Sequence, residues 1–207
     1  MSAAMAIQPA MKPAMAIRRA APRSFVRVSA LPGSETAARK AASRAASNGE
    51  LIRVRKGLYF KTTQTRYGAV KPRVEDVARE VLGPKSGFGP AGFSAARALG
   101  LTTQLPKKLQ IAALKTVEPI EGVEQHHRNN SLRSDLEERE IAVLEVLRAP
   151  DNYVEGGITR LAGALHLLVD SGDVRISALR TAVSRETSLV RKNFVDLELR
   201  LAVRVAV

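Results

Sequence analysis

The stretch GELIRVRKGLYF, residues 49–60, alternates apolar and cationic side chains and is interrupted by a Lys-Gly pair. Successive side chains of a strand point to opposite faces, so Ile52 and Val54 share one face and the two arginines beside them share the other. Gly57 supplies the positive φ that a tight turn requires. The stretch therefore predicts a two-stranded hairpin with an apolar face, which must pack on a core, and a basic face, which is open to an anion.

The positive charge of the chain is concentrated at its amino-terminal end. The 207 residues carry a formal net charge of +13. Residues 1–73 hold fifteen Lys and Arg and two acids, whereas residues 74–207 hold eighteen bases and eighteen acids, which cancel. A basic segment steers a protein toward phosphate polymers or anionic membranes. A surface that serves solubility alone would not explain so sharp a segregation.

The composition excludes several classes of protein. The chain has no Cys, which excludes a disulfide scaffold and a zinc finger and is typical of a reducing cytosol. No apolar run approaches the roughly 20 residues that a membrane span needs. We therefore expect a cytoplasmic protein with no membrane partner.

Residues 34–48 predict a helix with a very small inner face. Ser34 is a good N-cap, Glu35 suits the first turn, and Asn48-Gly49 is a good carboxy-terminal stop. At about 100° per residue, one side of this helix is made of alanines. That side comprises Ala37, Ala38, Ala41, Ala42 and Ala45, with Ala46 at its edge. The opposite side carries hydroxyls and cations, which are the side chains that contact base edges and phosphates in a major groove.

The order of these elements predicts a winged helix-turn-helix. A short helix over about residues 14–21 and a brief strand or one-turn helix in SFVRVSAL precede the alanine-rich helix and the hairpin. In this interpretation the apolar side of the hairpin (Ile52, Val54, Leu58, Phe60) closes the core, the basic side follows the DNA backbone, and the second helix enters the groove. The predicted DNA-binding residues are Thr36, Arg39, Lys40, Ser43, Arg44 and Ser47 on the helix, and Arg53, Arg55, Lys56, Tyr59 and Lys61 on the hairpin.

The remainder of the chain predicts a second, mainly helical domain. Residues 74–82 have the apolar spacing of a helix that Gly83 ends, AGFSAARALG a second helix, and KLQIAAL a strand. From Asp135 the pattern is helical, with four segments up to residue 203. We expect an α+β protein in three parts. Residues 1–13 are a flexible extension or a targeting peptide, residues 14–73 the winged helix, and residues 74–207 the mixed domain.

The segment ARKAASRAASNGELIRVRKGLYFKT, followed about thirty residues later by ARALGLTTQLPKKL, resembles the AbiEi-type antitoxins of type IV toxin–antitoxin systems and related domain-of-unknown-function proteins. The resemblance covers about residues 15–200. It implies a bacterial, nucleoid-associated autoregulator whose amino-terminal domain binds inverted repeats of double-stranded DNA in its own promoter. It also implies that the following domain counteracts a nucleotidyltransferase-like toxin.

The side chains that carry catalysis or bind metals are sparse. The three histidines are His126, His127 and His166. Adjacent histidines in a strand point apart and no partner follows at ligand spacing, so we interpret the pair as part of an exposed loop and His166 as a helix-packing residue. The acids of DLEERE are interpreted as the solvated face of a helix. No Gly-rich loop has the spacing of a nucleotide cradle. We expect no enzyme and no cofactor.

Other functions stay open. One is a stand-alone winged-helix transcription regulator without a toxin partner, a second is an RNA binder that uses the same basic hairpin, and a third is an enzyme whose site the sequence does not show. RNA recognition commonly uses aromatic side chains that stack on bases from a sheet. Aromatic content is 4%, and Tyr59 alone is well placed, so DNA is favoured.

Overall fold

The computed structural model of the chain describes residues 11–84 and 86–205. It is an α+β structure whose internal contacts divide it into two units, Met1–Arg73 and Val74–Val207. Most of the expected amino-terminal extension, residues 1–10, lies outside the described residues. Each unit is considered by itself below.

The first unit is built from two helices and a small sheet. Pro13 stands in the first turn of α1, where a missing N–H costs nothing, and Ser34 caps α2 by accepting a hydrogen bond from the Ala37 N–H. In chain order the elements are α1 (Pro13–Arg19), β1 (Phe25–Arg27), the 3-10 turn η1 (Val28–Ala30), α2 (Glu35–Ser47), β2 (Leu51–Arg55), β3 (Leu58–Lys61), β4 (Gln64–Thr65) and β5 (Gly68–Ala69). The predicted short helix, capped α2 and hairpin are therefore confirmed as elements, and SFVRVSAL, which was predicted to be a brief strand or a one-turn helix, forms β1 and then η1.

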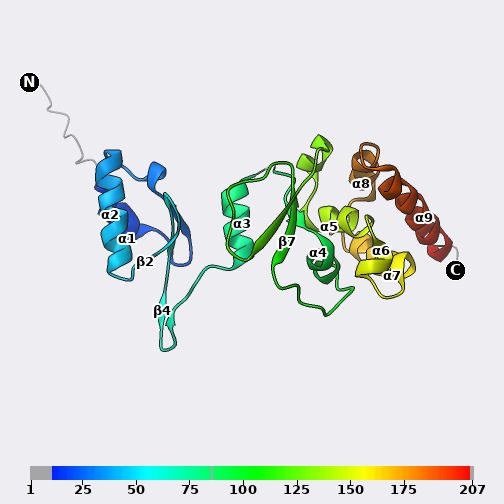
Figure 1. The fold of residues 1–207 in the computed structure, drawn as a ribbon, viewed down its shortest axis with the longest axis horizontal. Coiled ribbons are helices and arrows are strands. Elements are labelled where there is room, and N and C mark those ends of the chain that lie inside the picture. The colour runs from blue at the N-terminus through cyan, green and yellow to red at the C-terminus, as the bar shows by residue number, and fades with distance from the viewer. Residues whose placement is uncertain (1–10, 85, 206–207) are drawn as a thin grey trace, which may run out of the picture. The chain divides into compact units, whose positions relative to one another are not determined.

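The sheet of this unit has the antiparallel order β1-β3-β2, so β3 is its central strand (Figure 1). Helices α1 and α2 pack on one face of the sheet. That core contains Leu51 and Tyr59 from the hairpin and Ala38, Ala42 and Ala45 from α2. A second hairpin, β4–β5, extends beyond the sheet.

The prediction of which hairpin face closes the core was wrong. Leu51 and Tyr59 pack against the helices, while Leu58 and Phe60 lie on the opposite face, where the ring of Phe60 meets that of Phe25 edge-on at 5.4 Å. The physical reason is the third strand. Because β1 pairs with β3, it brings Phe25 against Phe60 on the far face, while the helices cover Tyr59 on the other, and all of Leu58, Tyr59 and Phe60 are buried.

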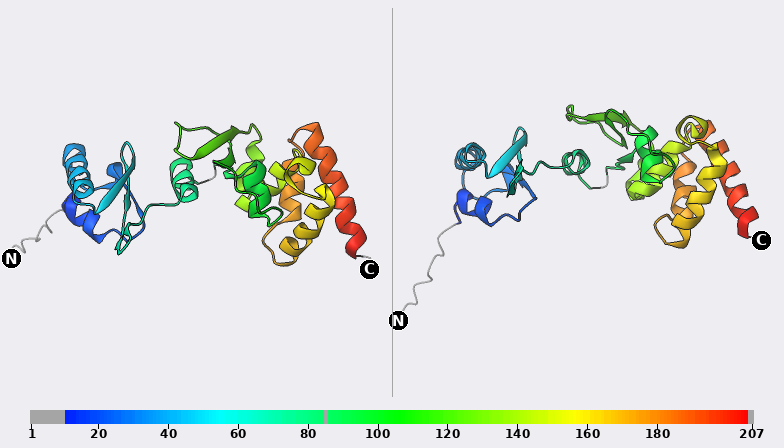
Figure 2. Two further views of the ribbon diagram at one scale, coloured as in Figure 1. Left: turned by 60° about the horizontal axis from the view of Figure 1, so that its bottom comes forward. Right: turned by 90° about the horizontal axis from the view of Figure 1, so that it is seen from below.

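The second unit contains a three-stranded sheet and most of the helices. Its elements are α3 (Val74–Leu82), β6 (Gly89–Pro90), α4 (Gly92–Ala98), β7 (Leu109–Ala113), β8 (Val123–His127), the 3-10 turn η2 (Ser131–Asp135), α5 (Glu138–Val146), α6 (Pro150–Tyr153), α7 (Gly157–Asp170), α8 (Ile176–Val183) and α9 (Ser188–Val205). The sheet order is β6-β7-β8, with β7 and β8 parallel. Within this unit the sheet lies at one end, α6 to α9 lie at the other, and α4 and α5 lie between them (Figures 1 and 2).

Helix α5 is the centre of the second unit and is buried on every side from Glu140 to Val146. The prediction that the acids of DLEERE form a solvated face was therefore wrong for Glu140. Its carboxylate accepts hydrogen bonds from the Arg175 guanidinium at 2.7 and 2.8 Å and from the Glu137 N–H at 2.8 Å. A buried charge is tolerated where a partner and hydrogen bonds compensate it, and here the partner comes from a distant segment.

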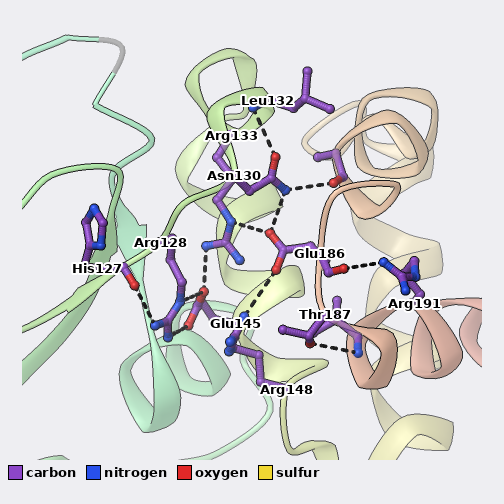
Figure 3. Close-up of polar contacts among 12 residues, drawn as sticks. His127, Arg128, Asn130, Leu132, Arg133, Glu145, Arg148, Glu186, Thr187 and Arg191 are labelled. Atoms are coloured by element: carbon purple, nitrogen blue, oxygen red, sulfur yellow. Dashed lines mark hydrogen bonds and ion pairs between the residues drawn. The ribbon is translucent and has the colours of Figure 1, made fainter.

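A second buried carboxylate on α5 organises a larger network (Figure 3). Glu145 accepts two hydrogen bonds from Arg128, at 2.6 and 2.9 Å, and one from Arg133 at 2.6 Å. The fully buried Arg133 also donates to Glu186 at 2.7 Å, and Glu186 in turn pairs with Arg148 at 3.2 Å. The network thus ties α5, η2 and the loop before α9 to one another through charged groups.

The described part of the chain contains no helix that is long and apolar enough to cross a membrane.

We predict that Glu145→Gln lowers the free energy of unfolding by about 3–5 kcal/mol, because it removes one of the two carboxylates that neutralise the buried Arg133 guanidinium and the carboxylate that pairs with Arg128. Glu138→Gln on the same helix is the matched control. Glu138 pairs with Arg79 in an ion pair that is roughly half exposed, so its loss should cost at most about 1 kcal/mol. Urea denaturation of the two full-length variants checks the difference, and equal losses would contradict this account of the network.

We also predict that acid destabilises the second unit through the same two glutamates. Burial raises the pKa of Glu140 and of Glu145, but hydrogen bonds and charges from Arg175, and from Arg128 and Arg133, outweigh it and hold each pKa below the ordinary 4.5. Their stabilising contribution is therefore complete above 4.5 and is lost as the pH falls through the lower folded-state values. Thermal unfolding at a series of acidic pH values should show a decline that is shallower in Glu140→Gln.

Candidate nucleic-acid interface

The outer side of α2 is exposed along its whole length. All six residues predicted to contact DNA from this helix are exposed: Thr36, Arg39, Lys40, Ser43, Arg44 and Ser47. The inner side packs through Ala38, Ala42 and Ala45, which are at most 7% exposed. Of the predicted inner residues, Ala37 is exposed. Because methyl groups alone fill the contact with α1 and the sheet, no long side chain of α2 is needed for packing.

The cations of α2 lie on two flanks. On one flank Arg39 forms an ion pair with Glu35 at 2.5 Å, and both side chains are about two-thirds exposed. Such a surface pair contributes little to stability, so the guanidinium can exchange this partner for a phosphate or a base. On the other flank Lys40 and Arg44 line a groove of about 510 Å³ between α1 and α2.

That groove adds two cations to the interface from outside α2. Lys12 and Arg18 line it from the α1 side, and Glu50 is its single acidic lining residue. The sequence interpretation did not include Lys12 or Arg18. Their position beside Arg44 depends on the packing of two helices, which the spacing within one helix cannot show.

The hairpin does not present its arginines on one face as predicted. Arg53 pairs with Tyr59, and Arg55 pairs with Leu58, which lies on the opposite face of β3. A bulge between Arg53 and Arg55 causes this, since one extra residue reverses the alternation of the strand. Arg53 and Lys56 are exposed, and Arg55 is half-buried. Gly57 has a φ of 75°, as the turn was predicted to require.

Two predicted DNA-binding residues of the hairpin instead make contacts inside the first unit. Tyr59 is 8% exposed and packs among the alanines of α2. The Lys61 ammonium donates to the Ile17 carbonyl at the end of α1, at 3.0 Å, and pairs with Glu50. Its side chain is 12% exposed. Both were placed on the basic face because a two-stranded hairpin was assumed, and we leave them out of the interface.

Arg27 is an exposed cation of the sheet that the sequence interpretation did not include. It lies opposite Leu58 on β1, as Arg55 does on β2. The two arginines therefore flank one apolar side chain on the far face of the sheet. Only the pairing of β1 with β3 reveals this arrangement.

The described residues of the second unit offer no cluster with the geometry of a metal site. They include no group of three or more His, Cys, Asp or Glu side chains that could hold a metal ion. His126 and His127 end strand β8, so their assignment to a loop was wrong. His127 contacts the Leu114 carbonyl at 2.9 Å, whereas His126 lies 3.5 Å from Glu124. His166 is not fully packed, as it lies half-exposed on α7 beside Asp170.

A groove of about 570 Å³ in the second unit has a mixed lining. Phe88, Pro90 and Ile111 supply its apolar part, and Arg97 and Lys107 are among its charged residues. Its Glu138 is already held by two hydrogen bonds from Arg79, at 2.6 and 3.0 Å.

Comparison with known proteins extends this picture at the level of family and fold. Residues 24–117 match DUF6088, a family of unknown function. The match begins just before β1, includes α2 and both hairpins, and continues to the loop after β7. No curated protein matches the chain in sequence.

A solved structure shares the fold. The chain is similar to the crystal structure of the RV2827C protein from Mycobacterium tuberculosis, with a TM-score of 0.52 and 16% sequence identity. The similarity covers 92% of this chain and 74% of that one. At this identity the likeness concerns the fold alone.

The position of Lys61 generates a prediction about stability. Lys61→Ala removes the donor to the Ile17 carbonyl and the partner of Glu50, and should lower the free energy of unfolding by about 1–3 kcal/mol. Lys56→Ala is the matched control, since Lys56 is exposed at the turn of the same hairpin and its loss should change stability by less than about 0.5 kcal/mol. Thermal melts of both variants test this. A Lys61→Ala protein as stable as the control would show that the contacts of Lys61 with Ile17 and Glu50 do not stabilise the fold.

Proposed function

We propose that this protein is a transcription regulator that binds double-stranded DNA through α2 and the β2–β3 hairpin. The observation that carries the proposal is the division of α2 into a buried side of alanines and an exposed side of hydroxyls and cations. Ser, Thr, Arg and Lys are the residue types that contact phosphates and base edges in the major groove.

The arrangement of the first unit supports a winged-helix interpretation. The sheet has the order β1-β3-β2, two helices pack on one face, and a hairpin directly follows the second helix. In this proposal η1, one turn long, stands where the first helix of a helix-turn-helix would cross the backbone. Helix α2 is the recognition helix, and Arg53 and Lys56 on the hairpin contact phosphates.

Electrostatics favour the same unit. The net charge of residues 1–73 equals that of the entire chain, and residues 74–207 are neutral. Attraction to a polyanion therefore acts on the first unit. In this proposal the neutral second unit contributes little to the attraction of DNA.

The structure gives less support to RNA binding through the sheet. Sheet-based RNA recognition needs aromatic rings that are open to stack on bases. Tyr59 is covered by the helices, and Phe60 on the other face is 4% exposed. Duplex DNA, read by a helix, remains the proposal.

The antitoxin part of the proposal rests on the resemblance to AbiEi-type proteins. In that interpretation the second unit counteracts a nucleotidyltransferase-like toxin, and the first represses the shared promoter. A neighbouring reading frame for such a toxin, and neutralisation of its product on co-expression, would support this role. Without such a gene, the stand-alone regulator is the better description.

We predict two distinguishable effects on DNA binding. Arg53→Ala and Lys56→Ala should weaken binding to any duplex and reduce the slope of log affinity against log salt by about one each, because each removes a phosphate contact. Arg39→Ala and Ser43→Ala should instead reduce discrimination between selected and random duplexes, by roughly 1–3 kcal/mol where a base contact is lost. Fluorescence anisotropy titrations at several salt concentrations measure both quantities.

Arg55→Ala is the matched control for the hairpin. It removes the same charge from the same strand, but on the far face, so its effect on the salt slope should be smaller than that of Arg53→Ala. If the full-length protein binds no duplex in a salt-dependent manner, the proposed function is wrong. Equal effects of Arg53→Ala and Arg55→Ala would refute the assigned binding face.

A further inference from the structure

The β4–β5 hairpin presents an exposed aromatic ring beside an ordered cation. Arg66 and Tyr67 form its tip, and Tyr67 is 83% exposed. The Arg66 guanidinium carbon lies 4.6 Å from the centroid of the Tyr67 ring, within the range of a cation–π contact. A tyrosine so open to solvent contributes little to packing in the unit that carries it, and its ring is free to contact a partner.

The tip is held by its own hydrogen bonds. The Tyr67 N–H donates to the Thr65 hydroxyl at 3.2 Å, and that hydroxyl donates to the Gly68 carbonyl at 2.9 Å. Gly68 has a φ of 106°, which other residues rarely adopt. At the base of the hairpin, the Thr62 hydroxyl donates to the Val70 carbonyl at 2.8 Å. The two tip side chains are therefore carried on a defined turn.

The hairpin is joined to the end of α2. The Gln64 side chain donates to the Gly49 carbonyl at 3.2 Å, directly after the helix cap at Asn48. Figure 1 shows the hairpin extending from this side of the unit, past the strands. The hairpin that carries Arg66 and Tyr67 at its tip is therefore anchored next to the carboxy-terminal end of α2.

The charge around the hairpin is of one sign. No acidic residue occurs between Glu50 and Glu75 in the sequence, whereas Arg66, Lys71 and Arg73 follow one another there. An acidic protein surface and a nucleic acid would both complement this charge. The link to α2 favours the polyanion that α2 is proposed to bind.

We propose that the β4–β5 hairpin is a second DNA-contacting element, which inserts Arg66 into the minor groove next to the major-groove segment read by α2 and sets the Tyr67 hydroxyl against a phosphate. This inference rests on the proposed function. A minor groove narrowed by A·T pairs has an enhanced negative potential that attracts arginine. Because Arg66 is already ordered on the ring of Tyr67, it loses less side-chain freedom on binding than a mobile arginine would.

The test compares full-length wild-type protein with Arg66→Ala, Tyr67→Ala and Tyr67→Phe. The probes are duplexes recovered by the wild-type protein from a random-sequence pool and rebuilt with either A·T or G·C flanks. Wild-type protein should prefer A·T flanks. Arg66→Ala should bind the A·T-flanked duplex roughly tenfold more weakly, which corresponds to about 1.4 kcal/mol, and should lose the preference. Tyr67→Phe, which keeps the ring, should retain the preference and lose one hydroxyl contact.

The control is Arg160→Ala, which removes the same charge from an exposed position on α7 in the neutral unit. Thermal melts establish that all variants fold. If Arg66→Ala and Tyr67→Ala bind like Arg160→Ala while Arg39→Ala loses discrimination, the hairpin inference is wrong and the proposed function stands. If wild-type protein binds no duplex, both are wrong. Tighter binding of the probes as single strands would replace the minor-groove inference with stacking on Tyr67.

Discussion

The close packing of alanine methyl groups under α2 is the constraint on which the first unit depends. Ala42 is fully buried, and Ala38 and Ala45 nearly so, in a core that also receives Ile17 from α1 and Tyr59 from the sheet. A larger residue at Ala42 would push the helix away from both neighbours, since close-packed interiors have little room for added atoms. The short inner side chains bring α2 close to the sheet, and its polar side is exposed as a consequence.

The second unit is organised in the opposite way, around charges. Glu140, Glu145 and Arg133 are buried in ion pairs that connect α5 to segments far away in the sequence. Buried ion pairs add little net stability compared with apolar packing, but a missing partner is costly. Because Arg133 on η2 is paired both with Glu145 on α5 and with Glu186 in the loop before α9, the network favours a packing that keeps these three segments together.

The sequence predicted the elements that local chemistry determines. Helix α2 begins after Ser34 and ends at Asn48, as expected. The alanine spacing identified its buried side, and Gly57 identified the turn of the hairpin. What the sequence could not show depends on contacts between distant segments. The packing of the helices on the sheet covers Tyr59, and the contacts of Lys61 with the Ile17 carbonyl and Glu50 leave its side chain mostly buried instead of on the surface.

The same limit applies to the acids and to the second hairpin. Glu140 looks like a surface residue until Arg175 is seen to reach it from 35 residues away. The segment Gln64–Ala69 is too short for its pattern to predict strands. The hydrogen bond from the Gln64 side chain to the Gly49 carbonyl, 15 residues away, cannot be read from the sequence. The cations predicted to be exposed on α2 are exposed, whereas two of the residues predicted to be exposed on the hairpin, Tyr59 and Lys61, are mostly buried.

The bulge in β2 has a consequence for kinetics. Because the bulge places Arg53 and Arg55 on opposite faces, the hairpin carries positive charge on both of its faces and not on one alone. A polyanion is then attracted from a wide range of directions, because long-range electrostatic attraction depends on the total charge and only weakly on the direction in which each side chain points. In the complex with DNA that we propose, Arg55 would accelerate encounter without contacting the bound duplex, so that substitutions at Arg53 and Arg55 would change the bound-state lifetime and the association rate separately.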